Sequence, residues 1–253
     1  IRSLMESALK TNESLKFAVI TGCLRISKES IFTGLNNMNV ISVISDSFAE
    51  YFGFTETEVQ KLCEKYEMNF EEARAWYNGY HLISHEGGTR KVYSMYSPKS
   101  VVEAMQKRKF GTYWNRTETY EALKIYIQMN MDGLKEAVVD MLGGGSVMIN
   151  TGTFNNDMTT FAVKDDVLTL LVHLGYLSYY EPDRTVSIPN KEDSLEFVNA
   201  ISTMDWHGVA ESVAASRKML ESLWNMESDA VAAGLEKAHK EIARLQYKDE
   251  NSL

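Results

Sequence analysis

The stretch Phe17-Ala-Val-Ile-Thr-Gly22 is an apolar run that ends in Thr-Gly and leads into a polar loop, Cys23 to Gly34. Because Phe17 to Ile20 has no polar face, the run predicts a short strand buried on both sides, as in a parallel sheet. A parallel partner needs a crossover connection, and only one amphipathic segment, Ile1 to Asn12, precedes the run. We therefore expect most of the sheet to lie outside this chain, which would be an internal piece of a larger protein.

Composition indicates a folded chain. Its 253 residues are 44% hydrophobic and 24% charged, which predicts a real core divided between two compact units. No run is long and uncharged enough to span a membrane, and no signal-peptide pattern occurs, so we expect a cytoplasmic protein with no membrane partner. A net charge of -9 disfavours broad nucleic-acid binding and leaves local basic patches open.

The first half of the chain predicts a helical block and a hairpin. Successive helix starts are expected at Ser45 or Asp46, at Thr55 with Glu58, and at Asn69 with Glu72, where capping residues precede apolar runs. The segment Tyr80 to Ser97 predicts a β-hairpin around the turn Glu86-Gly-Gly-Thr89. Ser97-Pro98 predicts the start of a helix over Lys99 to Arg108.

The second half predicts a mostly helical α+β fold. A helical region runs from Thr117 to Leu142 and breaks near Asp132-Gly133. Helix Asp165 to Leu174, the stop Gly175, and strands Tyr176 to Tyr180 and Thr185 to Pro189 are typical of the end of a winged-helix unit. Helices follow from Glu192 to Gln246, with stripes expected to be buried at Leu195, Val198, Ile201, Val209, Val213, Met219, Leu223, Leu235, Ile242 and Leu245.

Nine short motifs, spread over nearly the whole chain, resemble the bacterial AAA-ATPase-like family. They are Thr21-Gly22, Phe52 to Val59, Trp76-Tyr-Asn-Gly-Tyr80, Tyr96 to Val101, Phe110-Gly-Thr-Tyr-Trp114, Thr151 to Phe154, Asp165 to Leu168, His173 to Leu177 and Ile188-Pro-Asn190. Members of that family join a P-loop ATPase domain to a C-terminal PD-(D/E)xK nuclease-like domain. The resemblance implies a bacterial protein whose ATP-binding motifs precede Ile1 and whose nuclease motifs follow Leu253.

This resemblance implies three parts. Residues 1–98 would be the C-terminal part of the ATPase-like domain with its hairpin, 99–190 a helical and winged-helix-like unit, and 191–253 a helical lead-in to the nuclease-like domain. We expect no catalytic residue and no cofactor in this chain, although ATP and Mg would belong to the full-length protein. Whether that protein is an enzyme stays open.

The expected nucleotide contacts are three residues. The resemblance places Thr21 at the sensor position near the γ-phosphate. Arg25 and Lys28 follow the predicted strand end, where ligands of open α/β sheets bind, although exposed loop cations are common without any ligand. The chain has no phosphate loop, and Gly143-Gly-Gly-Ser146 lacks the required Lys and is better interpreted as a helix stop.

Nucleic acid has two candidate surfaces. The helix from Asp165 begins with two carboxylates, which repel phosphate. The stronger candidate combines cations with aromatics, which suits single-stranded bases, and consists of Lys107, Arg108, Lys109, Trp114 and Arg116. The alternative is that these cations only stabilise the C-terminal end of a helix, while the aromatic side chains pack in the core.

Metal binding is not expected, since the five histidines and two cysteines form no ligand spacing. Three hypotheses therefore remain: a non-catalytic remnant of a P-loop ATPase, a nucleic-acid-binding module, and a protein-interaction scaffold on the Tyr-rich segment Tyr77 to Tyr96.

Overall fold

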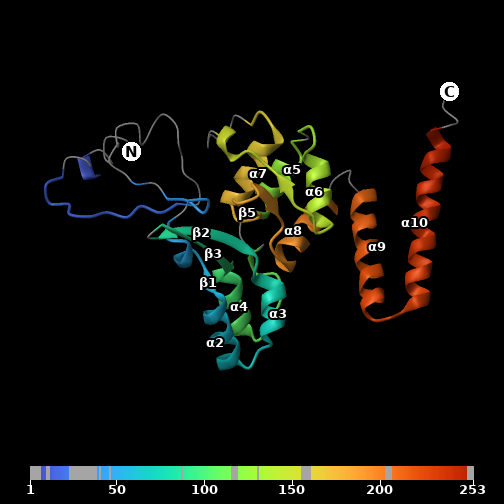
Figure 1. The fold of residues 1–253 in the computed structure, drawn as a ribbon, viewed down its shortest axis with the longest axis horizontal. Coiled ribbons are helices and arrows are strands. Elements are labelled where there is room, and N and C mark those ends of the chain that lie inside the picture. The colour runs from blue at the N-terminus through green and yellow to red at the C-terminus, as the bar shows by residue number, and fades with distance from the viewer. Residues whose placement is uncertain are drawn as a thin grey trace. The chain divides into compact units, whose positions relative to one another are not determined.

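A computed structural model describes residues 7–9, 12–22, 39, 41–45, 47–86, 88–114, 119–129, 131–154, 161–202 and 207–249 (Figure 1). The fold is α+β, about 53% helical, with two three-stranded antiparallel sheets. Its contacts divide the chain into two compact units, Ile1–Ala200 and Ile201–Leu253, which are described separately. The predicted boundaries after residues 98 and 190 stay predictions. Among the described residues, no helix has the length and apolar character to cross a membrane.

Three helices build the first core of unit 1. They are α2 (Glu56–Tyr66), α3 (Phe70–Tyr77) and α4 (Pro98–Lys107). Their apolar faces meet in one cluster of buried side chains that includes Val59, Ala73, Tyr77, Val101 and Met105. The helix predicted to start at Ser45 or Asp46 is only a short 3-10 turn, η1 (Ala49–Tyr51), which has no side-chain cap because its N-cap residue is Phe48.

The predicted capping box at α2 is confirmed. The Thr55 hydroxyl accepts from Glu58 N at 3.4 Å, and Glu58 Oε2 accepts from Thr55 N at 2.8 Å. The backbone hydrogen bond from Thr55 lowers the pKa of Glu58. At α3 the Asn69 side chain accepts from Glu72 N at 2.9 Å, so this predicted helix start is confirmed as well.

We expect Thr55→Ala to lower the free energy of unfolding of unit 1 by about 1 kcal/mol, because the helix loses an N-cap acceptor. Thr55→Ser keeps the hydroxyl and should cost only a few tenths of that. Urea unfolding followed by circular dichroism measures both. Equal losses in the two variants would mean that the methyl group, and not the cap, stabilises this end of α2.

The predicted hairpin is confirmed. Strands β2 (Tyr80–Glu86) and β3 (Thr89–Tyr96) pair from Tyr80↔Met95 to Glu86↔Thr89, and β1 (Phe54–Thr55) adds to the other side of β3. The sheet order is therefore β1-β3-β2. Strand β2 is the edge that faces the second sheet, since β2 contacts β5.

The rest of unit 1 is a second α+β group. It consists of α5 (Thr119–Ile127), α6 (Leu134–Leu142), β4 (Val147–Met148), η3 (Thr151–Thr153), α7 (Lys164–His173), β5 (Ser178–Tyr180), β6 (Thr185–Ser187) and α8 (Lys191–Ser202). The predicted break at Gly133 and the predicted stop at Gly175 are confirmed, and both glycines have positive φ, 76° and 83°. The sheet order is β4-β6-β5. Strand β4 is not predicted by the sequence, since two residues carry no alternation pattern.

Helix α7 has no exposed face. Every residue from Asp166 to Val172 is buried. Both carboxylates at its start bind backbone: Asp165 Oδ2 accepts from Asn150 N, and Asp166 Oδ2 accepts from Ala162 N and Val163 N. Helix α7 is therefore the core of this group.

Unit 2 is a pair of helices, α9 (His207–Trp224) and α10 (Ser228–Asp249), that contact each other. Figure 1 shows them side by side in red. Met219 packs toward Gly234, as the predicted stripe requires. Leu223 and Leu235, also predicted to be buried, are 58% and 56% exposed. That part of the prediction is wrong, because two helices bury only the face each turns to the other.

Candidate functional site at the junction of hairpin and second sheet

The predicted buried strand at Phe17 to Gly22 is wrong. The described residues 12–22 contain no strand, and Phe17 and Val19 are 81% and 72% exposed. A strand needs a neighbour to bond its N–H and C=O groups, and no described segment pairs with this one. Thr21 is exposed in this segment, and Arg25 and Lys28 lie outside the described residues.

The cations of the basic-aromatic candidate lie at the end of α4. Lys107 Nζ forms an ion pair with Glu103 and lies 4.6 Å from the centroid of the Tyr113 ring. Arg108 ends the helix in the left-handed conformation, and both Arg108 and Lys109 are exposed. Arg116 lies outside the described residues. The structure thus leaves all three described cations of this candidate exposed, with Lys107 in an ion pair.

The aromatic member of that candidate packs inward. The Trp114 ring lies 4.8 Å from the Tyr176 ring, and its Cζ2 and Cη2 atoms lie against Gly175. The carboxylate of Glu192 holds the Trp114 backbone, because Oε1 accepts from Trp114 N at 3.0 Å and also from Tyr113 N. Trp114 thus joins the segment that follows α4 to the turn between α7 and β5.

The backbone of the turn between α3 and β2 packs directly against the backbone of Pro189. Gly79 has φ 119°, and a Cβ built on it would lie 2.1 Å from Pro189 O. Beside it, Lys191 Nζ lies 4.4 Å from the centroid of the Trp76 ring. Two motifs of the sequence, Trp76–Tyr80 and Ile188–Asn190, therefore meet in space. We call Trp76–Tyr80 together with Pro189–Asp193 the junction.

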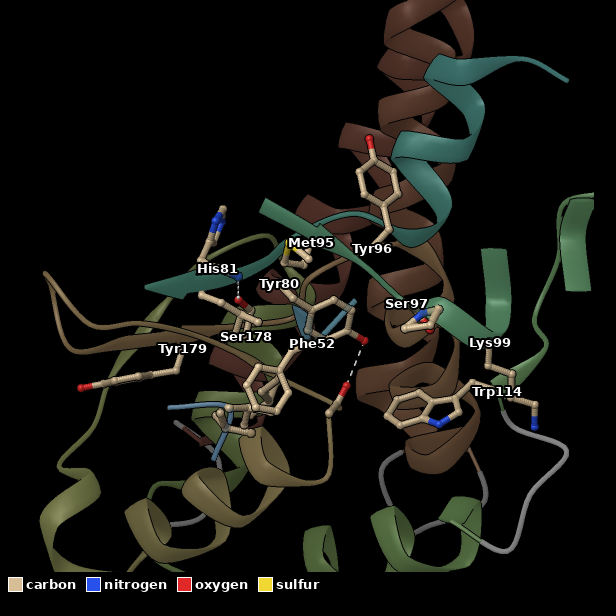
Figure 2. Close-up of a pocket in the computed structure, with 16 residues that line it drawn as sticks. Phe52, Tyr80, His81, Met95, Tyr96, Ser97, Lys99, Trp114, Ser178 and Tyr179 are labelled. Atoms are coloured by element: carbon tan, nitrogen blue, oxygen red, sulfur yellow. Dashed lines mark hydrogen bonds between the residues drawn. The ribbon is translucent and has the colours of Figure 1, made fainter. Parts of the chain in front are cut away.

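Tyr80 closes the junction through its hydroxyl. Figure 2 shows this side chain with its hydroxyl bonded to Gly175 O, at 2.9 Å, and Asp193 Oδ2 lies 2.8 Å away. The hydroxyl has one proton for two acceptors. When Asp193 is protonated it donates to Tyr80, and Tyr80 donates to Gly175, so both bonds are made.

The surroundings of Asp193 favour its protonated form. Asp193 is 1% exposed, and burial raises its pKa well above the usual range. The charge of Glu192 raises this pKa further, whereas the hydrogen bond with Tyr80 lowers it. Burial and the nearby Asp193 also raise the pKa of Tyr80. Burial therefore favours the protonated, uncharged form of both side chains, which suits a buried link.

The start of α8 is fixed by Asn190. Its Oδ1 accepts from Asp193 N at 3.0 Å, three residues on, which is the pattern of an N-cap. The cap orients Glu192 toward the Trp114 backbone and Asp193 toward the Tyr80 hydroxyl. One helix start thus holds both the α4 end and the hairpin.

The two sheets meet beside this link. His81 N donates to Ser178 Oγ at 2.9 Å, as Figure 2 shows, and the His81 ring packs edge-on to the Tyr180 ring at 5.7 Å. Burial lowers the pKa of His81, so its ring is neutral. Strands β2 and β5 are therefore joined through a side chain.

The side chains of the junction are suited to holding segments of the chain together. Asp193 and Glu192 are each 1% exposed, and their carboxylates bond to Tyr80 and to the backbone of Tyr113 and Trp114. Among the described residues, no group of three His, Cys, Asp or Glu could hold a metal ion. The Tyr-rich segment contributes to the core as well, since Tyr77 and Tyr96 are buried.

Sequence reasoning missed the roles of Gly79, Asn190, Glu192 and Asp193. The signal that could have found them is the pair of motifs Trp76–Tyr80 and Ile188–Asn190, which stand out in the sequence only as points of family resemblance. Acids at a helix start usually favour the helix dipole in solvent, so their burial is not visible from the pattern.

Comparison with known proteins gives one partial relative. The chain is 34% identical over 121 residues to an uncharacterized protein in the vnfD 5' region of Azotobacter chroococcum mcd 1. The match covers 47% of this chain and 22% of that protein. No protein-family model matches the chain, and no solved structure matches it.

Proposed function

We propose that this chain is a non-catalytic connecting module of an AAA-ATPase-like protein, in which a winged-helix-type unit serves as a rigid scaffold. It would join a P-loop ATPase-type part to a nuclease-like part. The observation that carries this proposal is the burial of α7, whose residues Asp166 to Val172 leave no exposed face for a nucleic acid. The family assignment rests on the resemblance of the motifs.

The order of elements supports a winged-helix-type unit. Helix α6, strand β4, the short turn η3, helix α7 and strands β5 and β6 follow one another, with sheet order β4-β6-β5. In DNA-binding proteins of the helix-turn-helix type, the recognition helix lies in the major groove and offers side chains to base edges. Helix α7 occupies the recognition position in sequence, and its side chains are used in packing.

The junction supports a connecting role. It links the hairpin to α8 through Tyr80 and Asp193, and the end of α4 through Glu192 and Trp114. These contacts join segments far apart in the chain, so a displacement of the hairpin would be transmitted to α8. A rigid connector needs such contacts, whereas a flexible linker has none.

We expect no binding of duplex DNA through α7. At physiological salt, labelled duplex should not saturate below about 100 µM, the range of non-specific binding. Fluorescence anisotropy with the 253-residue chain and a Lys164→Ala/His173→Ala variant tests this, since both side chains lie at the ends of α7. Sub-micromolar, salt-dependent binding that this variant loses would refute the scaffold role.

A second candidate function is weak binding of single strands at the end of α4. It is favoured by Arg108 and Lys109, which are exposed next to Phe110. We expect a Lys107→Ala/Arg108→Ala/Lys109→Ala variant to lose binding at low salt, because phosphate affinity comes from accumulated cations. A Lys61→Ala/Lys65→Ala variant on α2 is the control. If both variants lose equal affinity per charge removed, the attraction is non-specific and this candidate falls.

A further inference from the structure

A cavity of about 330 Å³ lies beside the junction within unit 1. Its walls come from β2, the end of β3, the start of α4, the segment from the end of α7 to β5, and the side chains of Val43, Phe52 and Trp114. The volume falls at the lower end of the roughly 300–1,000 Å³ found for small-molecule sites. The proposed connecting role does not use this cavity.

The walls are mainly aromatic and apolar. In Figure 2 the rings of Phe52, Tyr80 and Trp114 lie around one space, and Met95 and Leu177 also line it. The Tyr80 hydroxyl is bonded to Gly175 O, and the Trp114 ring packs on the Tyr176 ring and against Gly175, so both rings are held before any ligand arrives. Fixed rings favour a flat ligand, because stacking then costs little ordering of the protein.

The charge at the cavity has one sign. Lys99 lines it and is exposed, and none of the lining residues is Asp or Glu. The first turn of α4, which carries Lys99, contains no acidic side chain either. His81 also lines the cavity, and burial keeps its ring neutral by lowering its pKa. In Figure 2 the Lys99 side chain runs past Trp114, on the side away from Phe52, so its ammonium group lies at the rim of the cavity. An anionic group at this rim would meet one ammonium group and no competing carboxylate among the lining residues.

We propose that this cavity binds a small aromatic anion, with its ring between Phe52 and Trp114 and its acidic group at Lys99. A two-ring carboxylate suits the volume. Because the ligand touches both the hairpin and the α7–β5 turn, it stabilises their contact, and the melting temperature of unit 1 rises with ligand concentration.

The test uses 2-naphthoate as probe and the neutral 2-naphthamide as its matched partner. Calorimetry with the whole chain should give one site for 2-naphthoate, with a dissociation constant below about 1 mM. Lys99→Met should weaken 2-naphthoate about threefold to tenfold and leave 2-naphthamide unchanged, as expected for one partly exposed ion pair. Phe52→Ala should weaken both probes by about fivefold or more through lost ring contact.

Tyr51→Ala is the control for Phe52→Ala, because Tyr51 is the neighbouring ring, is 74% exposed and does not line the cavity. Circular dichroism spectra and melting curves without ligand establish that each variant is folded. The proposal is overturned if 2-naphthoate does not bind at 5 mM (roughly the weakest affinity calorimetry resolves), or if Phe52→Ala and Tyr51→Ala behave alike. It is also overturned if Lys99→Met weakens the acid and the amide equally, since the site would then not select an anion.

Discussion

A Gly79→Ala variant is expected to lose at least about 3 kcal/mol of unfolding free energy in unit 1. The added Cβ would lie 2.1 Å from Pro189 O and 2.8 Å from Pro189 C, well inside contact distance. Both neighbours are backbone atoms, so no side-chain rotation relieves the clash. The backbone at φ 119° is also strained for any residue with a Cβ.

The loss should have a recognisable pattern. To make room, the α3–β2 turn must move away from Pro189, and this separates Tyr80 from Asp193 and Trp76 from Lys191. Hydrogen exchange should therefore rise first in β2 and at the start of α8. The amides of α2 should keep their protection until global unfolding, since that helix packs in the first core.

Gly88→Ala is the matched control. Gly88 also has positive φ, 80°, but an added Cβ meets nothing within 4 Å. Its cost should be about 1 kcal/mol, the strain of the backbone conformation alone. Urea unfolding of both variants isolates the clash with Pro189. If Gly79→Ala costs no more than Gly88→Ala, the close approach does not hold the junction together.

Local signals in the sequence predict much of the fold correctly. The Thr55 capping box, the hairpin around Glu86 to Thr89, the break at Gly133 and the stop at Gly175 each depend on residues within one turn of each other. Physical rules for caps and turns act at that range, so one sequence suffices to apply them. The predicted limits of these elements differ from the observed ones by a few residues at most.

The prediction at Phe17 failed for a physical reason. An apolar run identifies a segment that is able to form a strand, but the strand exists only when a neighbour pairs with it. Among the described residues no neighbour is present, and the run is exposed.

The junction could not be predicted from local pattern. Tyr80 meets Gly175 and Asp193 across 95 and 113 positions of the chain. A pattern of caps does not say which helix start becomes buried, and Glu192 and Asp193 look like ordinary acids at a helix N-terminus. For the same reason the sequence could not decide whether the basic-aromatic candidate is a surface for single strands or a helix end with its aromatics in the core. Trp114 is close to cations in the sequence, whereas in the structure its ring packs against Gly175.

The pH dependence of stability should reveal the proton on Asp193. Its folded pKa is raised, chiefly by burial, whereas in the unfolded chain an Asp loses its proton near pH 4. The folded state therefore holds an extra proton above about pH 4, and the contribution of Asp193 to stability falls as pH rises until the folded pKa is passed. Asp193→Asn should remove this fall, since its amide donates to Tyr80 as the protonated acid does.

The expected result is a difference in unfolding free energy between the Asn variant and the parent chain that grows as pH rises above about 5 until the folded pKa of Asp193 is passed, by up to about 1.4 kcal/mol per pH unit. In this difference the contributions of the other titrating groups to stability cancel. His81 and His173, whose pKa values burial lowers, favour the folded state as pH rises and act equally in both proteins. Glu64→Gln, at an exposed carboxylate on α2, is the control for the loss of one acidic side chain. A flat difference for Asp193→Asn would mean that Asp193 is ionised in the folded state and that Tyr80 shares its one proton between two acceptors.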